Sequence, residues 1–387
     1  MVGTVFVVYT GFAFVLPFLP LYVRELGVED DVAAARWAGL LIGVAPLLAG
    51  LLAPLWGRLG DRHGHKGVIL LALLASAFFL GLSAFVRSPL ELLWLRIGTG
   101  LFGGVGPLSL AMATSLGRRS ETGQAVGLVQ AAQILAAAVG PLGGGLLADR
   151  VGIRSTFLVT ALLCFGAVVL VAALYDSPQK EPATKDRTPF FALLSLPGTR
   201  ALVAVSFLVN FVGRSLTPIL PLQLEGLGIP RDRLSSSTGA LISTYAVAAA
   251  LSAVLLGRAS RSRAPGRLLP GTLLAGGLTV LPMAHVAGYS PFLVLAGLLG
   301  LASGGSLTLC YTLGGLLVPE AARATAFGFF SGAALFGGAL SPSVAGFLAQ
   351  WDYRGIYYLD TAILLGLGLG LGLSSRVGKR QPGGHPQ

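Results

Sequence analysis

The sequence predicts an all-α membrane protein with about twelve transmembrane helices in two pseudo-symmetric six-helix bundles. Of its 387 residues, 54% are hydrophobic and only 11% are charged, whereas about 25% are charged in a typical soluble domain. Apolar runs of about 20 residues, the length of a helix that crosses ~30 Å of hydrocarbon, recur along the whole chain. Landmarks of the first half also recur in the second. These observations indicate that lipid is the solvent of this protein.

The predicted helices are the apolar runs bounded by charged and turn-forming residues. They lie at 2–22, 37–56, 67–86, 90–113, 124–147, 155–174, 201–222, 238–256, 268–287, 291–315, 321–348 and 356–374. Residues 175–200 are polar, charged and proline-bearing, which predicts a cytoplasmic linker between an N-terminal bundle (1–174) and a C-terminal bundle (201–374). The chain from 375 to 387 has no apolar periodicity and is predicted to be a disordered cytoplasmic tail.

The two halves share a repeat with an offset of 200 or 201 residues. Its matched landmarks are Pro17 with Pro218, Pro20 with Pro221, Gly57 with Gly257, and Pro141 with Pro342. A six-helix unit repeated in the same orientation is typical of two bundles that face each other across a site near the membrane midplane. Such bundles can rock about that site.

The net charge of +11 does not indicate nucleic acid, because the basic residues lie in short loops between apolar runs. Lys and Arg predominate in the alternate loops that include the linker, so the positive-inside rule puts the linker and both termini in the cytoplasm. Residues 2–22 have no basic segment before them and no small-residue cleavage site after them, which indicates a first membrane helix. We therefore expect a multi-pass protein of the cell inner (plasma) membrane.

Neither an enzyme nor a cofactor-binding protein is predicted. The sequence has no GxxxxGK[ST] loop for ATP. Cys164 and Cys310 lie in apolar runs without metal-ligand spacing, and His63 and His65 have no third ligand near them, so no metal is expected. Transport would then draw on a gradient, with a small molecule, protons and the lipid bilayer as the partners.

The segment 57–66, GRLGDRHGHK, follows the second predicted helix and sets one acid among several bases. Its glycines permit a tight turn. Asp61 would act as a latch on the N-terminus of a neighbouring helix, where the helix dipole favours negative charge, and the helix that starts near Ala321 is the candidate partner. The alternative is a solvated basic loop that only holds orientation.

Four segments resemble the major facilitator superfamily, namely GRLGDRHGHK at 57–66, LRIGTG at 95–100, VGPLGGG at 139–145 and PFLPLYVRELG at 17–27. The fifth-helix segment is similar to the drug:proton antiporter branch, which includes bacterial multidrug efflux proteins. Ala136 stands where that branch has its first glycine, and His65 replaces the usual Arg or Lys of the first motif. The resemblance implies the major facilitator fold, a monomer, and a conformational latch formed by Gly57, Asp61, Arg62, Gly64 and Lys66.

The fifth predicted helix contains Gly140, Pro141, Gly144 and Gly145. Gly140-Pro141 removes a helix hydrogen bond and a side chain at one place, so the helix can bend and pack closely. By resemblance, these residues form a hinge between the halves that controls closure of the outward side, and a static kink is the alternative. The counterpart near Pro342 has fewer glycines, so we expect the halves to differ in flexibility.

Two arginines lie inside predicted helices, where an ionisable group is costly and usually functional. Arg96 stands at the position of the family's membrane-embedded arginine, which implies a role in proton exchange or substrate binding. Snorkelling to the interface is the alternative reading for Arg96. Arg214 matches no motif of the family, and both readings stay open for it.

Acidic residues are predicted only near helix ends, close to the outer surface, at Glu25, Glu91, Glu225 and Asp360. A proton-coupled carrier needs a group that takes up and releases the proton. We therefore take Asp61 and Glu25 as the candidates for protonation, and a solvated helix-end charge is the alternative for Glu25.

By family geometry, the first, fourth, seventh and tenth helices would line the substrate cavity. Its candidate residues are Tyr9, Phe12, Tyr22, Phe102, Asn210, Phe211, Arg214 and Tyr311. An apolar, aromatic lining with few polar anchors suits lipophilic compounds of varied shape. Each ring is also compatible with ordinary helix packing.

The predicted function is therefore export of lipophilic or amphiphilic drug-like compounds by proton antiport and alternating access. A carrier for a specific anionic metabolite is the first alternative, because intramembrane arginines without a buried acid suit a carboxylate or phosphate. A sensor or scaffold on the same fold, which would bind without flux, is the second alternative.

Overall fold

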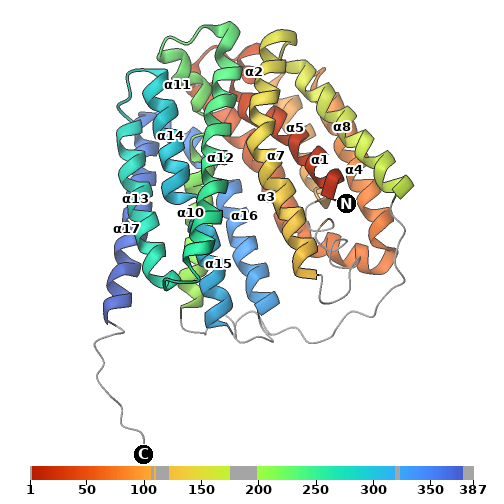
Figure 1. The fold of residues 1–387 in the computed structure, drawn as a ribbon. Coiled ribbons are helices and arrows are strands. Elements are labelled where there is room, and N and C mark those ends of the chain that lie inside the picture. Colours follow the sequence, from red (N-terminus) through yellow and green to blue (C-terminus); the bar gives the residue numbers. More distant parts are fainter. Residues whose placement is uncertain (1, 106–108, 110–121, 175–197, 319–322, 378–387) are drawn as a thin grey trace, which may run out of the picture.

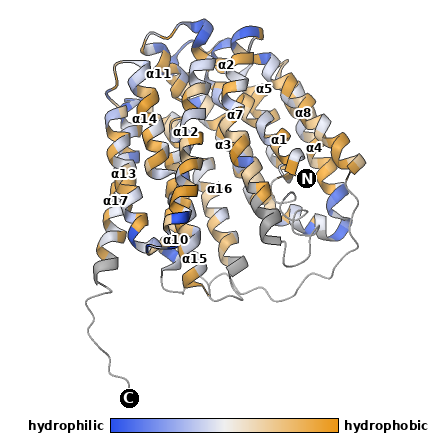
Figure 2. Ribbon diagram, in the orientation of Figure 1, coloured by the Kyte–Doolittle hydropathy of each residue, from blue (hydrophilic) through white to orange (hydrophobic). Residues whose placement is uncertain are grey.

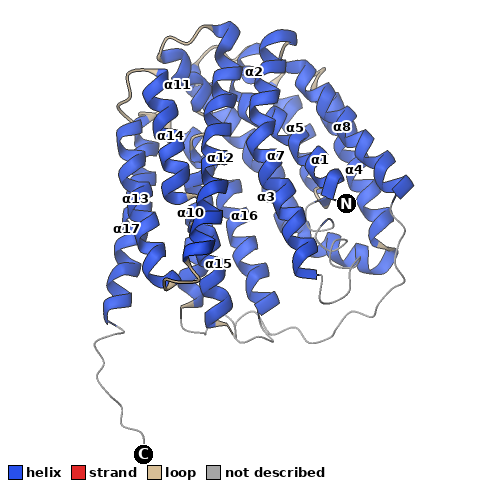
Figure 3. Cartoon of the chain, in the orientation of Figure 1, coloured by secondary structure: helices blue, strands red, loops and turns tan. Residues whose placement is uncertain are grey.

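The computed structural model describes residues 2–105, 109, 122–174, 198–318 and 323–377. In these residues every regular element is a helix (Figures 1 and 3). The first half contains α1 (Val2–Val15), η1 (Leu16–Phe18), α2 (Leu19–Glu25), α3 (Asp31–His63), α4 (His65–Ser83), α5 (Pro89–Leu101), α7 (Thr122–Val151) and α8 (Ile153–Leu174). The second contains α10 (Thr199–Ser215), α11 (Leu220–Gly226), η2 (Arg231–Arg233), α12 (Leu234–Ala259), α13 (Pro265–Met283), α14 (Tyr289–Ser303), α15 (Ser306–Leu317), α16 (Arg323–Leu348) and α17 (Arg354–Val377).

Within the described residues, nine helical segments are long and apolar enough to cross a membrane, or ten if α10 and α11 form one broken span. The two predicted spans outside this set are the fourth, which continues from α5 into residues that the structure does not describe, and the ninth, α13. The all-α membrane fold predicted from the sequence is confirmed. The number of spans is consistent with twelve.

Most helices are longer than the apolar runs that predicted them, because charged residues extend them beyond the hydrocarbon. The second predicted helix, 37–56, is part of α3, which begins where the Asp30 carboxylate accepts a hydrogen bond from Ala33 N at 2.7 Å. α3 continues through Gly57 to His63, so the expected loop after the second helix is wrong. The turn is confined to Gly64, whose φ of 91° favours glycine.

Prolines break the first and seventh predicted helices, which the sequence had indicated as continuous. Pro17 lies in η1 between α1 and α2, and Pro218 lies between α10 and α11, which are bent by 40°. Proline donates no backbone hydrogen bond and crowds the preceding turn. The repeat therefore duplicates a break, at equivalent places in the two halves.

Two large hydrophobic clusters form the core. Buried residues of the first lie between Val8 and Val171, and those of the second lie between Leu202 and Leu364, apart from Ala35 of α3. We call α1–α8 the N-terminal bundle and α10–α17 the C-terminal bundle. Figure 1 shows the two side by side, with α3, α7, α12 and α16 between them.

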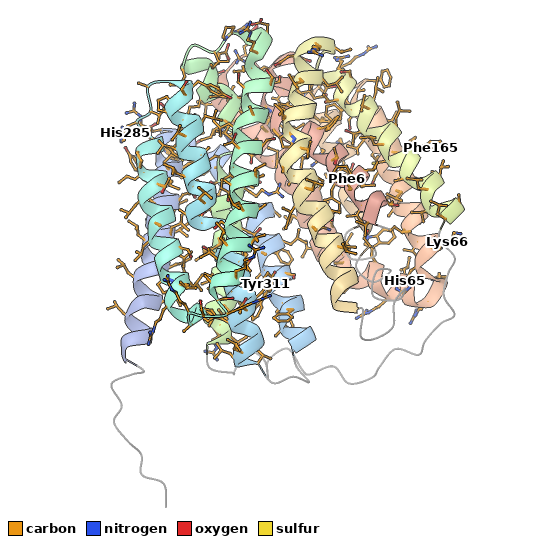
Figure 4. The ribbon with its side chains drawn as sticks, in the orientation of Figure 1. Phe6, His65, Lys66, Phe165, His285 and Tyr311 are labelled. Atoms are coloured by element: carbon orange, nitrogen blue, oxygen red, sulfur yellow. The ribbon has the colours of Figure 1, made fainter. Side chains whose placement is uncertain are left out.

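Apolar side chains also cover the outside of the bundles. Phe165 on α8, for example, is 54% exposed and points away from the protein (Figure 4). Hydrophilic residues gather at the two ends of the helices (Figure 2). We call the end with α2 and α11 the upper end, and the end with His65 and Lys66 the lower end, as they are drawn in Figures 1 and 4.

Candidate substrate pathway between the two bundles

Charged residues from both bundles meet at the upper end. Arg24 at the end of α2 forms an ion pair with Glu225 on α11. Arg231 also binds Glu225, with its Nε 2.8 Å from Oε1, and Arg24 lies 3.6 Å from Asp31. Arg24 and Glu225 are 201 residues apart, so the pair joins equivalent places of the repeat across the boundary between the bundles.

Below this cluster, α7 packs closely against α12, and we call this contact the α7–α12 seam. A Cβ added at Gly239 would lie 2.1 Å from the Pro141 carbonyl oxygen, and one added at Gly145 would lie 2.4 Å from the Ser235 carbonyl oxygen. Real Cβ atoms essentially never approach that closely. The backbones of the two bundles therefore touch here because the seam has no side chains at these positions.

The contact between α3 and α16, the α3–α16 seam, repeats this arrangement. A Cβ at Gly39 would lie 2.2 Å from the Pro342 carbonyl oxygen, and one at Gly346 would lie 2.4 Å from the Ala35 carbonyl oxygen. Each of these positions is 200 or 201 residues from its counterpart in the other seam. The upper half of the interface is thus closed by two equivalent backbone contacts.

The α7–α12 seam also carries a charge. The two carboxylate oxygens of Asp149, near the end of α7, accept hydrogen bonds from Ser235 N at 3.0 Å and Ser236 N at 2.7 Å. These amides belong to the first turn of α12, which has no side-chain cap of its own. An acid from one bundle therefore caps a helix of the other, where the helix dipole favours negative charge.

Arg214 lies near residues of both bundles. Its Cγ is 3.4 Å from the place a Cβ would take at Gly338 on α16, and Tyr9 of α1 and Tyr245 of α12 are close enough to interact with its charge. The residue is nevertheless exposed to water, although helices of both bundles surround it. Arg214 therefore marks a water-accessible space between the bundles, and no described carboxylate forms an ion pair with it.

Four predicted cavity residues are accessible on helices of the two bundles. Tyr9 and Phe12 of α1 form an edge-on pair with ring centroids 6.1 Å apart, and Asn210 lies one turn before Arg214 on α10. Tyr311 of α15 approaches α16, with its hydroxyl 3.2 Å from Ser331 Oγ, and lies in the lower part of the view in Figure 4. All four are partly exposed, and their place in the lining of the substrate cavity stays a prediction.

Three other predicted cavity residues lie within the bundles. Tyr22 has no exposed surface, and its hydroxyl donates to Ser83 O at 2.7 Å inside the N-terminal core, so it does not line the space. Phe102 packs against Trp56 and Phe79 in the same bundle. Phe211 is 7% exposed and lies where α10 meets α16, since Ser341 Oγ donates to its carbonyl oxygen at 2.5 Å. The sequence shows where aromatic residues occur along a helix but does not show which face of the helix packs inside its own bundle.

Arg96 is buried on the face of α5 that packs against α3. Its Nε donates to the Leu41 carbonyl oxygen at 2.9 Å, and the residue is only 4% exposed. No described acid forms an ion pair with it. The structure therefore places Arg96 inside the N-terminal bundle, and it does not meet Arg214 in the space between the bundles.

The four residues of the predicted hinge have two different roles in packing. A Cβ at Gly140 would lie 2.5 Å from Ala13 Cβ, and one at Gly144 would lie 2.5 Å from Phe14 Cα, so both glycines admit α1 of the same bundle. Pro141 and Gly145 face α12 of the other bundle. α7 is continuous through this segment. The same stretch of α7 therefore contacts α1 of its own bundle and α12 of the other bundle.

Parts of the predicted latch lie outside what the structure describes. The Asp61 side chain and the region of Ala321 are among these parts. Gly57 has no atom within 4 Å of an added Cβ, and Lys66 donates to the Ala172 carbonyl oxygen at 2.9 Å near the end of α8. Glu25, the other candidate for protonation, is exposed at the upper end.

Sequence reasoning missed the most deeply buried acid among the described residues. Asp360 was expected near the outer surface because it stands close to the start of a helix, and the structure shows in addition that its side chain is fully buried. Asp360 is the single charged residue of the predicted helix 356–374, and this was the available sign. Hydropathy did not show that it shares a helix face with Tyr357 and Leu364, both of which are buried.

Comparison with known proteins gives a consistent result. A sequence model of the Major Facilitator Superfamily matches residues 1–289 and 202–386. The multidrug resistance protein MdtG of Proteus mirabilis is 29% identical over 364 residues, which cover 93% of this chain and 90% of that protein. MdtG of Escherichia fergusonii is 30% identical over 368 residues, which cover 93% and 90%.

Solved structures with the same fold are more distant in sequence. A bacterial homologue of the human lysosomal transporter Spinster, in an inward-facing and occupied conformation, superimposes with a TM-score of 0.80 at 17% identity, covering 97% of this chain and 96% of that one. A D-xylose–proton symporter gives a TM-score of 0.74 at 15% identity, covering 96% and 95%.

Proposed function

The chain belongs to the Major Facilitator Superfamily of membrane transporters, and we propose that it exports lipophilic or amphiphilic drug-like molecules in exchange for protons. The family resemblance stated from the sequence motifs is thereby confirmed, and transport requires no ATP site in this chain. Relatives named multidrug resistance proteins support the proposed substrate class. The proposed unit is a monomer of two bundles, 1–174 and 201–374, joined by the linker 175–200.

The observation that carries the proposal is the water-accessible space around Arg214. Tyr9 and Tyr245 are close enough to interact with the charge of Arg214, Phe12 pairs with Tyr9, and Asn210 lies one turn before Arg214 on α10. Flat rings with few fixed polar partners accept apolar molecules of different shapes, while the cation and the amide interact with a polar end. Amphiphilic compounds match this chemistry.

Alternating access is supported by the way the upper end is closed. The two seams are backbone contacts between rigid helices, and only a few polar links, such as Asp149 with α12, accompany them. A small separation of the bundles breaks all of these contacts together, as expected for a two-state rearrangement. Gly140, Pro141, Gly144 and Gly145 would act as the hinge, and Asp61, near the C-terminal end of α3, would act as the latch at the lower end.

The lower end is proposed to face the cytoplasm. Because both native cysteines are buried, a single introduced cysteine reports sidedness against a low background. We expect D352C, before α17 at the upper end, to react with an impermeant maleimide in intact cells. S262C, in the loop before α13, should react only after permeabilisation. The reverse pattern would overturn the proposed orientation.

A carrier for a specific anion remains the second candidate, because Arg214 is accessible and has no described carboxylate partner. Arg binds carboxylates through two parallel hydrogen bonds, which Lys cannot reproduce. R214K should therefore abolish transport of an anionic substrate and change the flux of a lipophilic cation by no more than about threefold. Arg96 is tested by the same pair of measurements with R96K.

The decisive experiment is flux of a fluorescent lipophilic dye in proteoliposomes, with and without an imposed pH gradient. The proposal requires gradient-driven dye movement that a protonophore abolishes and that protein-free liposomes lack. Gradient-independent movement would retain the transporter and reject proton coupling. Absence of movement in folded, oriented protein would reject the drug-export proposal in favour of the anion carrier.

A further inference from the structure

We propose that Asp360 is the residue that binds and releases the coupling proton, and that Ser215 transmits its protonation state to the break between α10 and α11. The inference rests on the proposed proton antiport. It assigns the proton to a site inside the C-terminal bundle, away from both Asp61 and Glu25.

Asp360 is a buried acid without a cation. It has no exposed surface on α17, and one oxygen, Oδ1, has no hydrogen-bond partner. Among the described residues, no Lys, Arg or His forms an ion pair with it. A carboxylate in such a place would be both desolvated and unpaired, which is costly, whereas the neutral acid is tolerated.

The hydrogen bonds at Ser215 favour the neutral acid. Ser215 Oγ lies 2.5 Å from Asp360 Oδ2 and 2.9 Å from the Val212 carbonyl oxygen. A carbonyl oxygen only accepts, and a hydroxyl has a single proton to donate. With ionised Asp360, both neighbours would need that one proton. With protonated Asp360, its O–H donates to Ser215, which donates to Val212, so both contacts are satisfied.

The groups around Asp360 are mostly neutral. Tyr357 on its own helix and Tyr245 on α12 are near enough to interact with its charge. The other titratable groups on the helices packed against α17 are Arg200 and Arg214 of α10, Arg267 of α13 and Arg323 of α16. Those just beyond are Cys310 and Tyr311 of α15 and His285 after α13. His285 forms a hydrogen bond with Tyr358 on the outer side of α17. None of the described ones forms an ion pair with Asp360.

Tyr245 is close to both Asp360 and Arg214, since it interacts electrostatically with each of them. A partly open cavity of about 70 Å³ adjoins Tyr245, and its wall includes Thr217, Tyr245 and Ser303 among apolar side chains. Leu364, one turn beyond Asp360, also lines it. Hydroxyl groups on the wall can hold water, which provides a path for a proton toward Asp360.

The same helix face of α17 binds both sides of the break in the seventh span. Asp360 contacts Ser215, the last residue of α10, and the Tyr357 hydroxyl donates to the side-chain oxygen of Gln223 on α11. α11 carries Glu225, which pairs with Arg24 of the other bundle. Loss of the proton would draw the Ser215 hydroxyl from Val212 to the carboxylate and change the last turn of α10. Protonation is thereby connected to closure of the upper end.

The test compares D360N with wild type in two assays of the same proteoliposomes. Asn mimics the neutral acid, because its amide N–H donates to Ser215 in place of the acid O–H. D360N should therefore fold and exchange dye for dye across the membrane within about twofold of wild type. Its dye flux driven by a pH gradient should fall to the level of protein-free liposomes.

D352N is the matched control, since Asp352 is an exposed acid close to the same end of α17 and only caps it, accepting from Arg354 N at 2.8 Å. It should retain both activities. Gradient-driven flux in D360N equal to that of D352N would overturn the assignment to Asp360 while leaving proton antiport intact. A wild type without gradient-driven flux would instead overturn the proposed function itself.

Infrared difference spectra of the purified protein, recorded between high and low pH, measure protonation of carboxyl groups independently of transport. Wild type should show the C=O band of a protonated carboxyl group that D360N lacks and D352N retains. If D360N also loses dye exchange, the infrared spectrum still tests whether Asp360 carries the proton. A carboxyl band unchanged in D360N would overturn the proposal, and its specific loss would support it. S215A should keep the band and alter the pH dependence of flux.

Discussion

The α7–α12 and α3–α16 seams make the same backbone contacts and yet differ in charge. In both, a glycine admits the carbonyl oxygen of a proline in the facing helix, at 2.1 Å from a Cβ added at Gly239 and 2.2 Å from one added at Gly39. The N-terminus of α3 is capped by Asp30 of its own bundle. That of α12 is capped by Asp149 of the other bundle, and the position equivalent to Asp149 is the uncharged Gln350.

The difference shows which features the repeat had to preserve. Close approach of two helices requires a small residue at each contact point, so both halves keep their glycines. A helix cap can come from any nearby acid, so the halves are free to differ. Separation of the bundles would therefore uncap α12 and leave α3 capped, and the two seams should respond differently when the upper end opens.

The largest effect on closure of the upper end is expected from adding a side-chain atom at the close backbone contacts of the seams. G239A and G39A each force a Cβ against a carbonyl oxygen, and overpacking of this kind costs about 1–3 kcal/mol. Both variants should shift the protein toward an open upper end by about 5- to 150-fold. Pulsed electron spin resonance between labels at the upper ends of α8 and α14 measures the shift.

G166A is the control for these variants, because Gly166 is exposed on α8 and nothing lies within 4 Å of an added Cβ. It should leave the distance distribution unchanged. Equal effects of G239A and G39A would support equivalence of the seams. An effect confined to one variant would show that the two seams share their backbone geometry and yet contribute unequally to closure of the upper end.

Removing the cap that crosses the interface should have the next largest effect. D149N loses the negative charge at the first turn of α12, which is worth about 0.5–2 kcal/mol. The open upper end should gain population by about 2- to 30-fold. D30N, which changes a cap within one bundle, should lower thermal stability without changing the distance between the bundles. A shift of the same size in D30N would contradict the distinction between the seams.

Each seam also has one hydrogen bond made by a serine side chain, and the repeat relates Leu142 to Ser343 but does not relate the two serines to each other. Leu142 N donates to Ser243 Oγ at 3.2 Å in one, and Ser343 Oγ donates to Gly39 O at 3.2 Å in the other. S243A and S343A should each destabilise the closed upper end by about 0.5–1.5 kcal/mol. The same distance measurement should show additive shifts in the double variant, because the two bonds share no partner. Strong coupling would indicate that the seams open as one unit.

The smallest effect is expected at the ion pair between Arg24 and Glu225. Both side chains are partly accessible, with 22% and 23% exposed, so E225Q should cost about 0–1 kcal/mol. Added salt should reduce the difference between E225Q and wild type. The exchanged pair R24E/E225R should recover part of the loss. A cost larger than that of D149N would reverse the ranking of the upper-end contacts.

The sequence was sufficient to predict most helices because burial in lipid imposes long apolar runs on every span. It was less informative about where helices end. α3 extends to His63 through a segment expected to be a loop, since charged residues remain helical outside the hydrocarbon. The breaks at Pro17 and Pro218 were visible only as matched prolines, because a proline can kink or end a helix and hydropathy does not distinguish the two.

The candidate site stays largely a prediction. Arg214, Tyr9 and Asn210 were expected in the substrate space, and the structure brings Tyr9 and Asn210 close to Arg214. Tyr22 was expected there as well and is buried in the N-terminal core. Asp360 was set aside as a helix-end acid. Each outcome depended on the direction in which a side chain leaves its helix, which a nearly uniform apolar sequence does not encode.

By itself, the sequence determined the lipid environment, the two related halves and the family, because composition and repeated motifs are properties of the chain alone. The tertiary structure decided which glycines admit a facing backbone, which acid caps a helix of the other bundle, and which acid is buried without a cation. These properties depend on distances between residues about 100 to 300 positions apart, and such distances exist only once the helices have packed.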